Sequence, residues 1–153
     1  MFVLQIVQNK SINNSAMPNQ FENNSSGARI VISTFVVFAA ITFIIAALTH
    51  LQLTLSLGIA EPKIIPAAIV EGLCALFFIN SAFRIFINSK SAWRATFFAH
   101  AFAIAGIILG MISLAVGAGP RTKTNDLYHS IMLLLIVADS FYLLTKGKAA
   151  FKK

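Results

Sequence analysis

The sequence predicts an all-α protein, a four-helix transmembrane bundle with the N and C termini in the cytoplasm. Of its 153 residues, 58% are hydrophobic and only 11% are charged, whereas soluble domains carry about 25% charged residues. Four apolar segments each approach the roughly 20 residues that a helix needs to cross a bilayer. The Lys and Arg residues gather on one side of these segments, as expected for the cytoplasmic side of a membrane protein.

The charge balance points to lipid as the main partner. The net charge is +7, but the basic residues flank the apolar segments, where membrane topology requires them. We therefore expect a lipid bilayer as the partner and no nucleic acid, with other membrane proteins or a second copy of the chain as further candidates. Cys74 is the single cysteine, so there is no intrachain disulfide. Walker, GxSxG and HExxH motifs are absent from the sequence.

Three regions are predicted along the chain. Residues 1–28 are rich in Asn, Ser and Gln, a composition that favours a disordered polar tail. Residues 29–147 form the four-span membrane domain, and residues 148–153 form a basic C-terminal tail. Met17 stands just before the first apolar segment, so translation can start at Met1 or at Met17.

The first two spans are predicted at residues 30–50 and 64–87. Arg29 stands at the beginning of the first span. Pro66 opens the second, where the first helical turn tolerates a proline. The connection at residues 51–62 alternates apolar and polar residues as a strand does, although no partner strand is evident. An extended lid and a frayed extension of the first helix both fit this segment.

The third and fourth spans are predicted at residues 92–117 and 127–144. Ser91 is the expected N-cap of the third span, and Trp93 is its expected anchor at the membrane interface. Thr124 or Asn125 is the expected N-cap of the fourth span. Residues 88–91 form a tight turn, and the glycine and proline of the 117–124 loop end the third helix.

A small residue recurs every three or four positions along the third span. In hydrocarbon, helices associate where small side chains let their backbones approach closely. This pattern predicts a packing seam and makes the third span the central helix of the bundle. The seam contains Ala92, Thr96, Ala99, Ala103, Gly106, Gly110, Ser113 and Gly117.

Orientation follows from the distribution of the twelve Lys and Arg residues. Nine would lie on the side of the two termini and three on the opposite side, so the termini are predicted in the cytoplasm. The protein is then a multi-pass protein of the cell membrane. The nine are Lys10, Arg29, Arg84, Lys90, Arg94, Lys146, Lys148, Lys152 and Lys153; the three are Lys63, Arg121 and Lys123.

Two segments carry a resemblance to other proteins. Residues 61–76 read EPKIIPAAIVEGLCAL and residues 119–129 read GPRTKTNDLYH. In these segments the chain resembles an uncharacterised family of small four-span bacterial integral membrane proteins, over roughly residues 41–144. The resemblance implies the four-span architecture and a bacterial inner membrane. No activity is attached to that family, so it implies no functional residue.

Ionisable residues inside a span are costly and mark candidate functional sites. By depth and helical face, His50, Glu71 and His129 are predicted to form an outer polar cluster, with Glu61 and Asp126 above it. Asp139 and His100 are predicted to lie deeper, together with Asn80.

Several interpretations of these polar residues stay open. They can simply hydrogen-bond to one another and fix the register of the helices. His50, Glu71 and His129 can hold a divalent metal ion, since imidazole and carboxylate suit zinc, copper or iron. His50 and His129 can hold a haem. A proton or small-solute path can run through His129, Asp139 and His100.

Two classes of function follow from these interpretations. The first is a non-enzymatic membrane bundle, which acts as a subunit, an assembly factor or a small carrier. The alternative is a metal- or haem-dependent membrane oxidoreductase with a His/Glu site on its outer face. The sequence predicts no particular cofactor, and a divalent metal is the candidate that its residue types allow.

Overall fold

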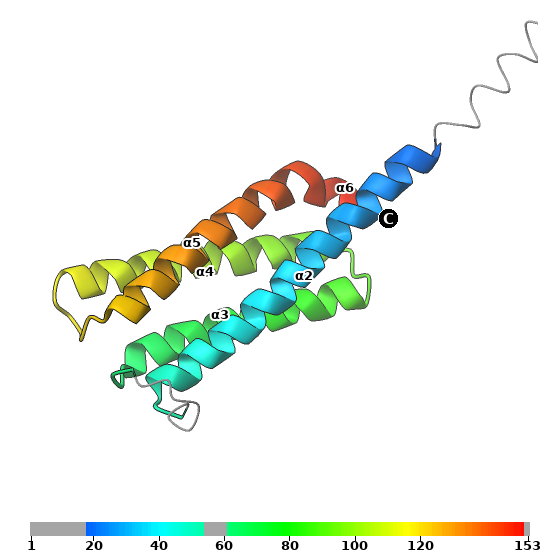
Figure 1. Ribbon diagram of the computed structural model, residues 1–153. Helices are drawn as coiled ribbons and strands as arrows, with labels where there is room; N and C mark the ends of the chain where they lie inside the picture. The colour runs from blue at the N-terminus through cyan, green and yellow to red at the C-terminus, as the bar shows by residue number, and fades with distance from the viewer. Residues whose placement is uncertain (1–17, 54–60, 152–153) are drawn as a thin grey trace, which may run out of the picture.

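The computed structural model describes residues 18–53 and 61–151, and in this part of the chain all regular secondary structure is helical (Figure 1). The elements are α2 (Pro18–His50), α3 (Ile65–Phe86), α4 (Ala92–Ala115), α5 (Lys123–Tyr142), the π-helix η2 (Leu143–Gly147) and α6 (Lys148–Ala150).

Four helical segments are long and apolar enough to cross a membrane. At 1.5 Å per residue, the 22 residues of α3 extend over about 33 Å, close to the ~30 Å of a bilayer's hydrocarbon core. The prediction of an all-α protein with four membrane spans is confirmed at this level. The segments are Ser26–His50, Ile65–Phe86, Ala92–Ala115 and Lys123–Ala150.

The helices form a bundle in chain order. Helix α2 packs on α3, α3 on α4 and α4 on α5, while α2 meets the last helix chiefly through η2 and α6. The α2–α3 and α4–α5 connections lie at one end of the bundle, here called the loop end (Figure 1). The α3–α4 turn, residue 151 and the projecting start of α2 lie at the other, here called the terminal end.

The helix boundaries differ from the predicted spans mainly near the chain termini. Helix α2 ends at His50 as predicted but begins at Pro18, so residues 18–28 of the predicted disordered tail are helical; residues 1–17 lie outside the described residues. The fourth span continues past residue 144 to Ala150 through η2. Residues 148–150 of the predicted C-terminal tail therefore form α6.

Local hydrogen bonds fix the loop end. Thr122, and not Thr124 or Asn125, caps α5, because its side chain accepts a hydrogen bond from the Asn125 N–H. The Ile64 N–H donates to the His50 carbonyl over 3.1 Å, which ties the start of α3 to the end of α2. The strand-like alternation predicted in the first connection falls largely on residues 54–60, outside the described residues.

The seam of small residues on α4 divides into two halves. In the first half, Ala92, Thr96, Ala99 and Ala103 are almost fully buried. A Cβ atom added at Gly106 would lie 2.9 Å from Val70 Cγ1 of α3, so the Val70 side chain packs directly against the α4 backbone there.

The second half of the seam packs loosely. A Cβ atom at Gly110 would meet no atom within 4 Å, and Ser113 is half-buried. Gly117 is exposed and has φ +80°, a conformation that favours glycine. It ends the helix, because the Ala118 N–H returns to the Ser113 carbonyl. The seam therefore opens toward the loop end.

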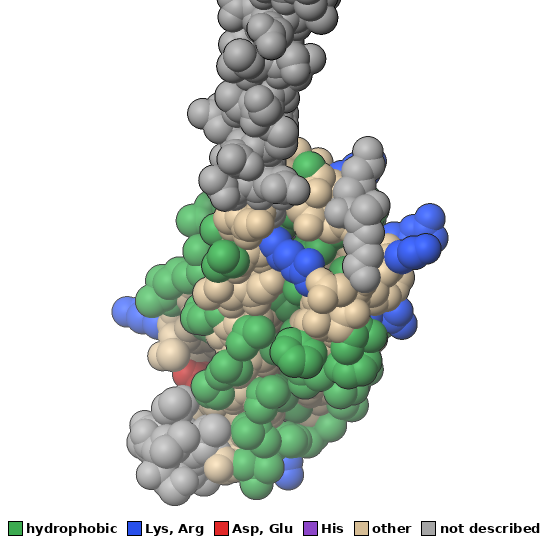
Figure 2. Space-filling view, turned by 90° about the vertical axis from the view of Figure 1, so that its right-hand side faces the viewer, with side chains coloured by type: hydrophobic (Ala, Val, Ile, Leu, Met, Phe, Trp, Pro, Cys, Tyr) green, Lys and Arg blue, Asp and Glu red, His purple; other side chains and the backbone are tan. Residues whose placement is uncertain are grey.

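The outer surface of the bundle exposes many large apolar side chains, as expected of helices that lie in a bilayer. Figure 2 shows hydrophobic side chains over much of one face, with a few Lys and Arg side chains in its upper half and at its edges. Large apolar side chains from every spanning helix are exposed, among them Phe38, Leu76, Phe98 and Leu134. A bilayer covers such a band with lipid chains.

Candidate functional site

The three residues of the predicted outer cluster lie together near the loop end. His50 closes α2, Glu71 lies in α3 and His129 lies in α5. His50 Nε2 is 3.7 Å and His129 Nε2 is 3.6 Å from the same Glu71 oxygen, Oε1. The three residues are only 3–6% exposed. Three helices thus bring two imidazoles to one carboxyl group, which we call the His–Glu–His cluster.

Several polar atoms of this cluster have no hydrogen bond. Within the described residues, both Glu71 oxygens are buried without one, as are His50 Nδ1 and the nearby Tyr128 hydroxyl. The two imidazole nitrogens near Glu71 are beyond hydrogen-bond distance. Because a buried polar group without a hydrogen bond is unfavourable, the cluster has the chemistry of a site that receives a further proton donor or cation.

The proton on His129 is placed by its backbone partner. His129 Nδ1 lies 2.9 Å from the Asn125 carbonyl oxygen, which can only accept, so Nδ1 carries a hydrogen. In the neutral imidazole, Nε2 is then an acceptor and faces the Glu71 carboxyl, itself an acceptor when ionised. The cluster is electrically neutral when it holds one positive charge beside an ionised Glu71, either as a proton or as a cation.

A cavity of about 260 Å³ opens beside the cluster. Helices α3 and α4 form most of its wall, with Glu71 and His129 at its polar end and Asn125 next to them. The remaining wall is largely apolar and includes Phe43, Val70, Ile107, Leu109, Leu114, Ala118 and Gly119. The loose half of the α4 seam, at Gly110 and Ser113, also lines it, so the missing side-chain volume there creates the cavity.

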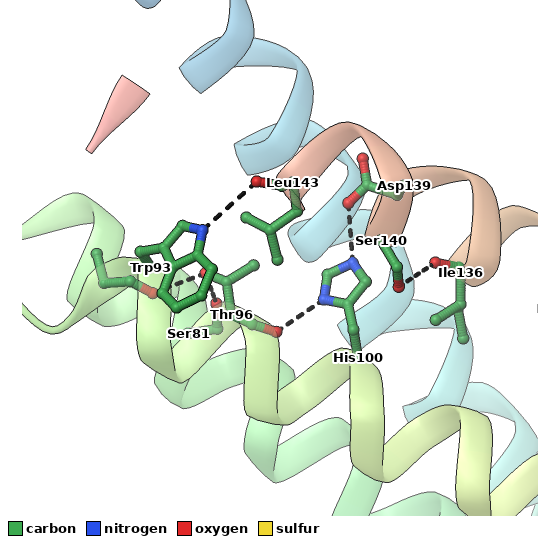
Figure 3. A network of polar contacts seen from close by, with 9 residues as sticks. Ser81, Trp93, Thr96, His100, Ile136, Asp139, Ser140 and Leu143 are labelled. Carbon is green, nitrogen blue, oxygen red and sulfur yellow. Dashed lines mark hydrogen bonds and ion pairs between the residues drawn. The ribbon is translucent and has the colours of Figure 1, made fainter. Parts of the chain in front are cut away.

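The second polar level is a tight pair. His100 Nε2 of α4 lies 2.8 Å from Asp139 Oδ2 of α5, and His100 Nδ1 lies 2.8 Å from the Thr96 carbonyl (Figure 3). Since that carbonyl accepts, Nδ1 carries a hydrogen. A second proton therefore lies between Nε2 and the carboxylate. Unlike the His–Glu–His cluster, this pair has its hydrogen bonds satisfied.

Asn80 does not belong to the deeper level, contrary to the prediction. It is exposed and accepts a hydrogen bond from Arg84 Nε. The next residue, Ser81, is fully buried and lies 2.7 Å from Thr96 Oγ1. One position along a helix turns a side chain by about 100°, which exchanges a lipid-facing residue for a buried one. Ser81 was missed because the sequence does not show which of these two adjacent uncharged polar residues faces the interior.

An apolar layer separates the two polar levels. On α5, buried Met132 and Ile136 lie between His129 and Asp139. On the facing helices, Phe43 and Phe78 stack with ring centroids 5.8 Å apart, and Phe78 meets the edge of His100. The five ionisable residues thus form two separate groups.

The other predicted polar residues lie at the loop end. Glu61 Oε2 accepts a hydrogen bond from Thr122 Oγ1 over 2.6 Å, and Asp126 pairs with Arg121 over 2.7 Å. At the terminal end, the Trp93 indole N–H donates to the Leu143 carbonyl (Figure 3). Lys148 Nζ lies 5.2 Å from the centre of the Trp93 ring. Sequence reasoning identified Trp93 but not its partner in η2.

The donor set was also considered for a metal ion. Within residues 18–53 and 61–151, no three His, Cys, Asp or Glu side chains are grouped so that they could hold one. The two imidazole nitrogens of the His–Glu–His cluster face one carboxyl oxygen, which suits a shared proton or a donor group.

The fold and the site define a multi-span membrane protein with a buried polar cluster beside an apolar cavity. Comparison with protein-family models, curated proteins and solved structures finds no match for the chain. The resemblance to small four-span bacterial membrane proteins accordingly stays a prediction.

Proposed function

We propose that the protein is a non-enzymatic membrane protein, a small carrier that takes up one positive charge, as a proton or a cation, at Glu71. The observation that supports this proposal is that, within the described residues, both Glu71 oxygens are buried without a hydrogen bond at the polar end of a cavity. A structural polar contact between helices would leave no such atoms, and the His100–Asp139 pair illustrates that case. Among a subunit, an assembly factor and a carrier, the cavity favours the carrier.

We also propose the orientation that the sequence predicts. Among the described residues, six Lys and Arg residues lie at the terminal end and three at the loop end, so the terminal end faces the cytoplasm. The cavity then lies in the outer half of a cell membrane. The resemblance to small four-span bacterial membrane proteins favours a bacterial inner membrane. The six are Arg29, Arg84, Lys90, Arg94, Lys146 and Lys148, and the three are Lys63, Arg121 and Lys123.

Chemical modification of carboxyl groups tests the proposed site. Dicyclohexylcarbodiimide, an apolar reagent, attacks protonated carboxyl groups in apolar surroundings. We expect mass spectrometry to find Glu71 modified and Asp139 unmodified, because Asp139 is bonded to His100 and does not line the cavity. Glu71→Gln is the matched control and should remove the adduct. An unmodified Glu71 would refute a protonatable site reached through the cavity.

The oxidoreductase alternative is addressed by a different measurement. Metal analysis and an absorption spectrum of the purified protein report a bound metal or haem directly. A stoichiometric metal that is lost in both His129→Ala and Glu71→Gln would favour the alternative over a carrier of one positive charge.

A further inference from the structure

We infer that the cavity binds a small organic monocation, a primary ammonium group carried on an apolar body, with the ammonium beside Glu71. This inference rests on the proposed function and names the class of ligand. The alternatives for the same site are a bare metal ion and a lipid headgroup, and three properties of the cavity separate them.

The first property is the kind of hydrogen-bonding atom at the polar end. An ionised Glu71 offers two acceptors, and neutral His129 offers Nε2 because its Nδ1 hydrogen is held by the Asn125 carbonyl. These groups come from α3 and α5. His50 of α2, the Cys74 thiol of α3 and the Tyr128 hydroxyl of α5 also lie near Glu71, but in the described part of the chain none of them donates a hydrogen bond to its carboxyl group. The α4 wall is apolar or glycine apart from Ser113. An ammonium group supplies the N–H donors that such acceptors lack.

The second property is charge. Among the residues that the structure describes, neither Lys nor Arg lines the cavity, so one carboxylate with two neutral imidazoles carries a single negative charge. A monovalent cation neutralises it, whereas a divalent ion would leave an excess positive charge in a medium where charge is costly. The phosphate of a lipid headgroup would likewise have no cation to pair with.

The third property is size and shape. At about 260 Å³, the cavity is several times the ~30 Å³ that one water molecule takes up in the liquid, and it is near the lower end of small-molecule pockets. Its walls away from the polar end at Glu71, His129 and Asn125 are largely apolar and offer few groups to replace the water of a hydrated metal ion. The open space over Gly110 can accommodate a ring or a short alkyl chain.

Binding of 2-phenylethylammonium to the purified protein in phosphatidylcholine nanodiscs tests this inference by calorimetry. Neutral 2-phenylethanol is the matched ligand, since it has the same apolar body without the charge. We expect the ammonium to bind at least about tenfold more tightly than the alcohol. Replacing the ammonium by a hydroxyl group removes one partner of a buried charge pair, and such a loss weakens binding by this factor or more. Equal binding of both ligands, or no binding of the ammonium, would overturn the inference.

Two variants locate the ligand. Glu71→Gln should weaken ammonium binding at least about tenfold and affect alcohol binding much less, because the alcohol carries no charge. Gly110→Leu should abolish binding of both, because its side chain fills space that is empty, while Ile108→Phe on the exposed face should bind normally. Normal binding in Gly110→Leu would overturn the assignment to this cavity.

The carbodiimide reaction distinguishes failure of this inference from failure of the proposed function. Protection of Glu71 by 2-phenylethylammonium supports the ligand class. If Glu71 is modified but the ammonium neither binds nor protects it, the ligand class is wrong and the protonatable site stands. If zinc protects Glu71 and the ammonium does not, a metal ion is the occupant.

Discussion

His100 Nε2 and Asp139 Oδ2 lie 2.8 Å apart in the interior of the bundle, and the Thr96 carbonyl engages the other ring nitrogen. With both nitrogens committed, the pair is either an imidazolium beside a carboxylate or a neutral imidazole beside a carboxylic acid. Both forms have zero net charge, so neither leaves an uncompensated charge in the interior. The hydrogen bond between the two side chains joins α4 to α5.

Removing both members of this pair should cost less stability than the two single removals added together. Asp139→Leu should lower the free energy of unfolding in mixed micelles by about 1–2 kcal/mol, the range of hydrogen bonds between membrane helices. The double variant His100→Leu/Asp139→Leu should lose less than the sum of the single variants, because no polar group stays unpaired. Additive losses would show that the two side chains do not interact. Ser140→Ala, which removes only a local hydrogen bond, is the control.

The two glycines of the α4 seam should respond in opposite ways to alanine. Gly106→Ala places a methyl group 2.9 Å from Val70 Cγ1 and should lower the melting temperature, and Val70→Ala should restore it. Gly110→Ala meets no atom within 4 Å and should be neutral or stabilising, since alanine favours a helix by up to ~1 kcal/mol over glycine. Equal destabilisation at both positions would contradict the division of the seam.

Thr122 should matter more than its neighbour Thr124. The Thr122 hydroxyl accepts from the Asn125 N–H and donates to Glu61, so it both caps α5 and ties it to the start of α3. Thr122→Ala should cost about 1 kcal/mol of stability, measured by thermal unfolding in detergent. Thr124 is exposed, and Thr124→Ala should leave the stability unchanged. Equal effects at the two threonines would argue against the cap.

Cysteine labelling tests the proposed orientation. Cys74 is buried, and Cys74→Ala gives a cysteine-free background. Thr124→Cys at the loop end should react with a membrane-impermeant maleimide on intact cells, whereas Lys148→Cys should react only after permeabilisation. Both positions are exposed in the structure. The reverse pattern would place the terminal end outside.

Hydropathy was enough to predict the four spans, because each apolar run is long and bounded by polar or turn-forming residues. Depth along the helices was also enough to group His50 with Glu71 and His129, whose function stays a proposal. The cavity could not be predicted, because Gly106 and Gly110 belong to one regular pattern and only the position of Val70 distinguishes them. Asn80 and Ser81 show the same limit, since hydropathy does not say which of two adjacent polar residues turns inward.

The side-chain hydrogen bonds that join α3 to α4, within the described residues, lie toward the terminal end. Ser81 bonds to Thr96 and Arg84 bonds to Ser91, close to the turn that connects the two helices. Beyond Gly106 the same helices are separated by the cavity. Widening the space between the two helices at the loop end therefore breaks no side-chain hydrogen bond between α3 and α4 themselves, although the Glu61–Thr122 bond still joins the segments next to them. If the proposed ligand binds in the cavity, it can enter and leave at this end while the Ser81–Thr96 and Arg84–Ser91 bonds stay in place.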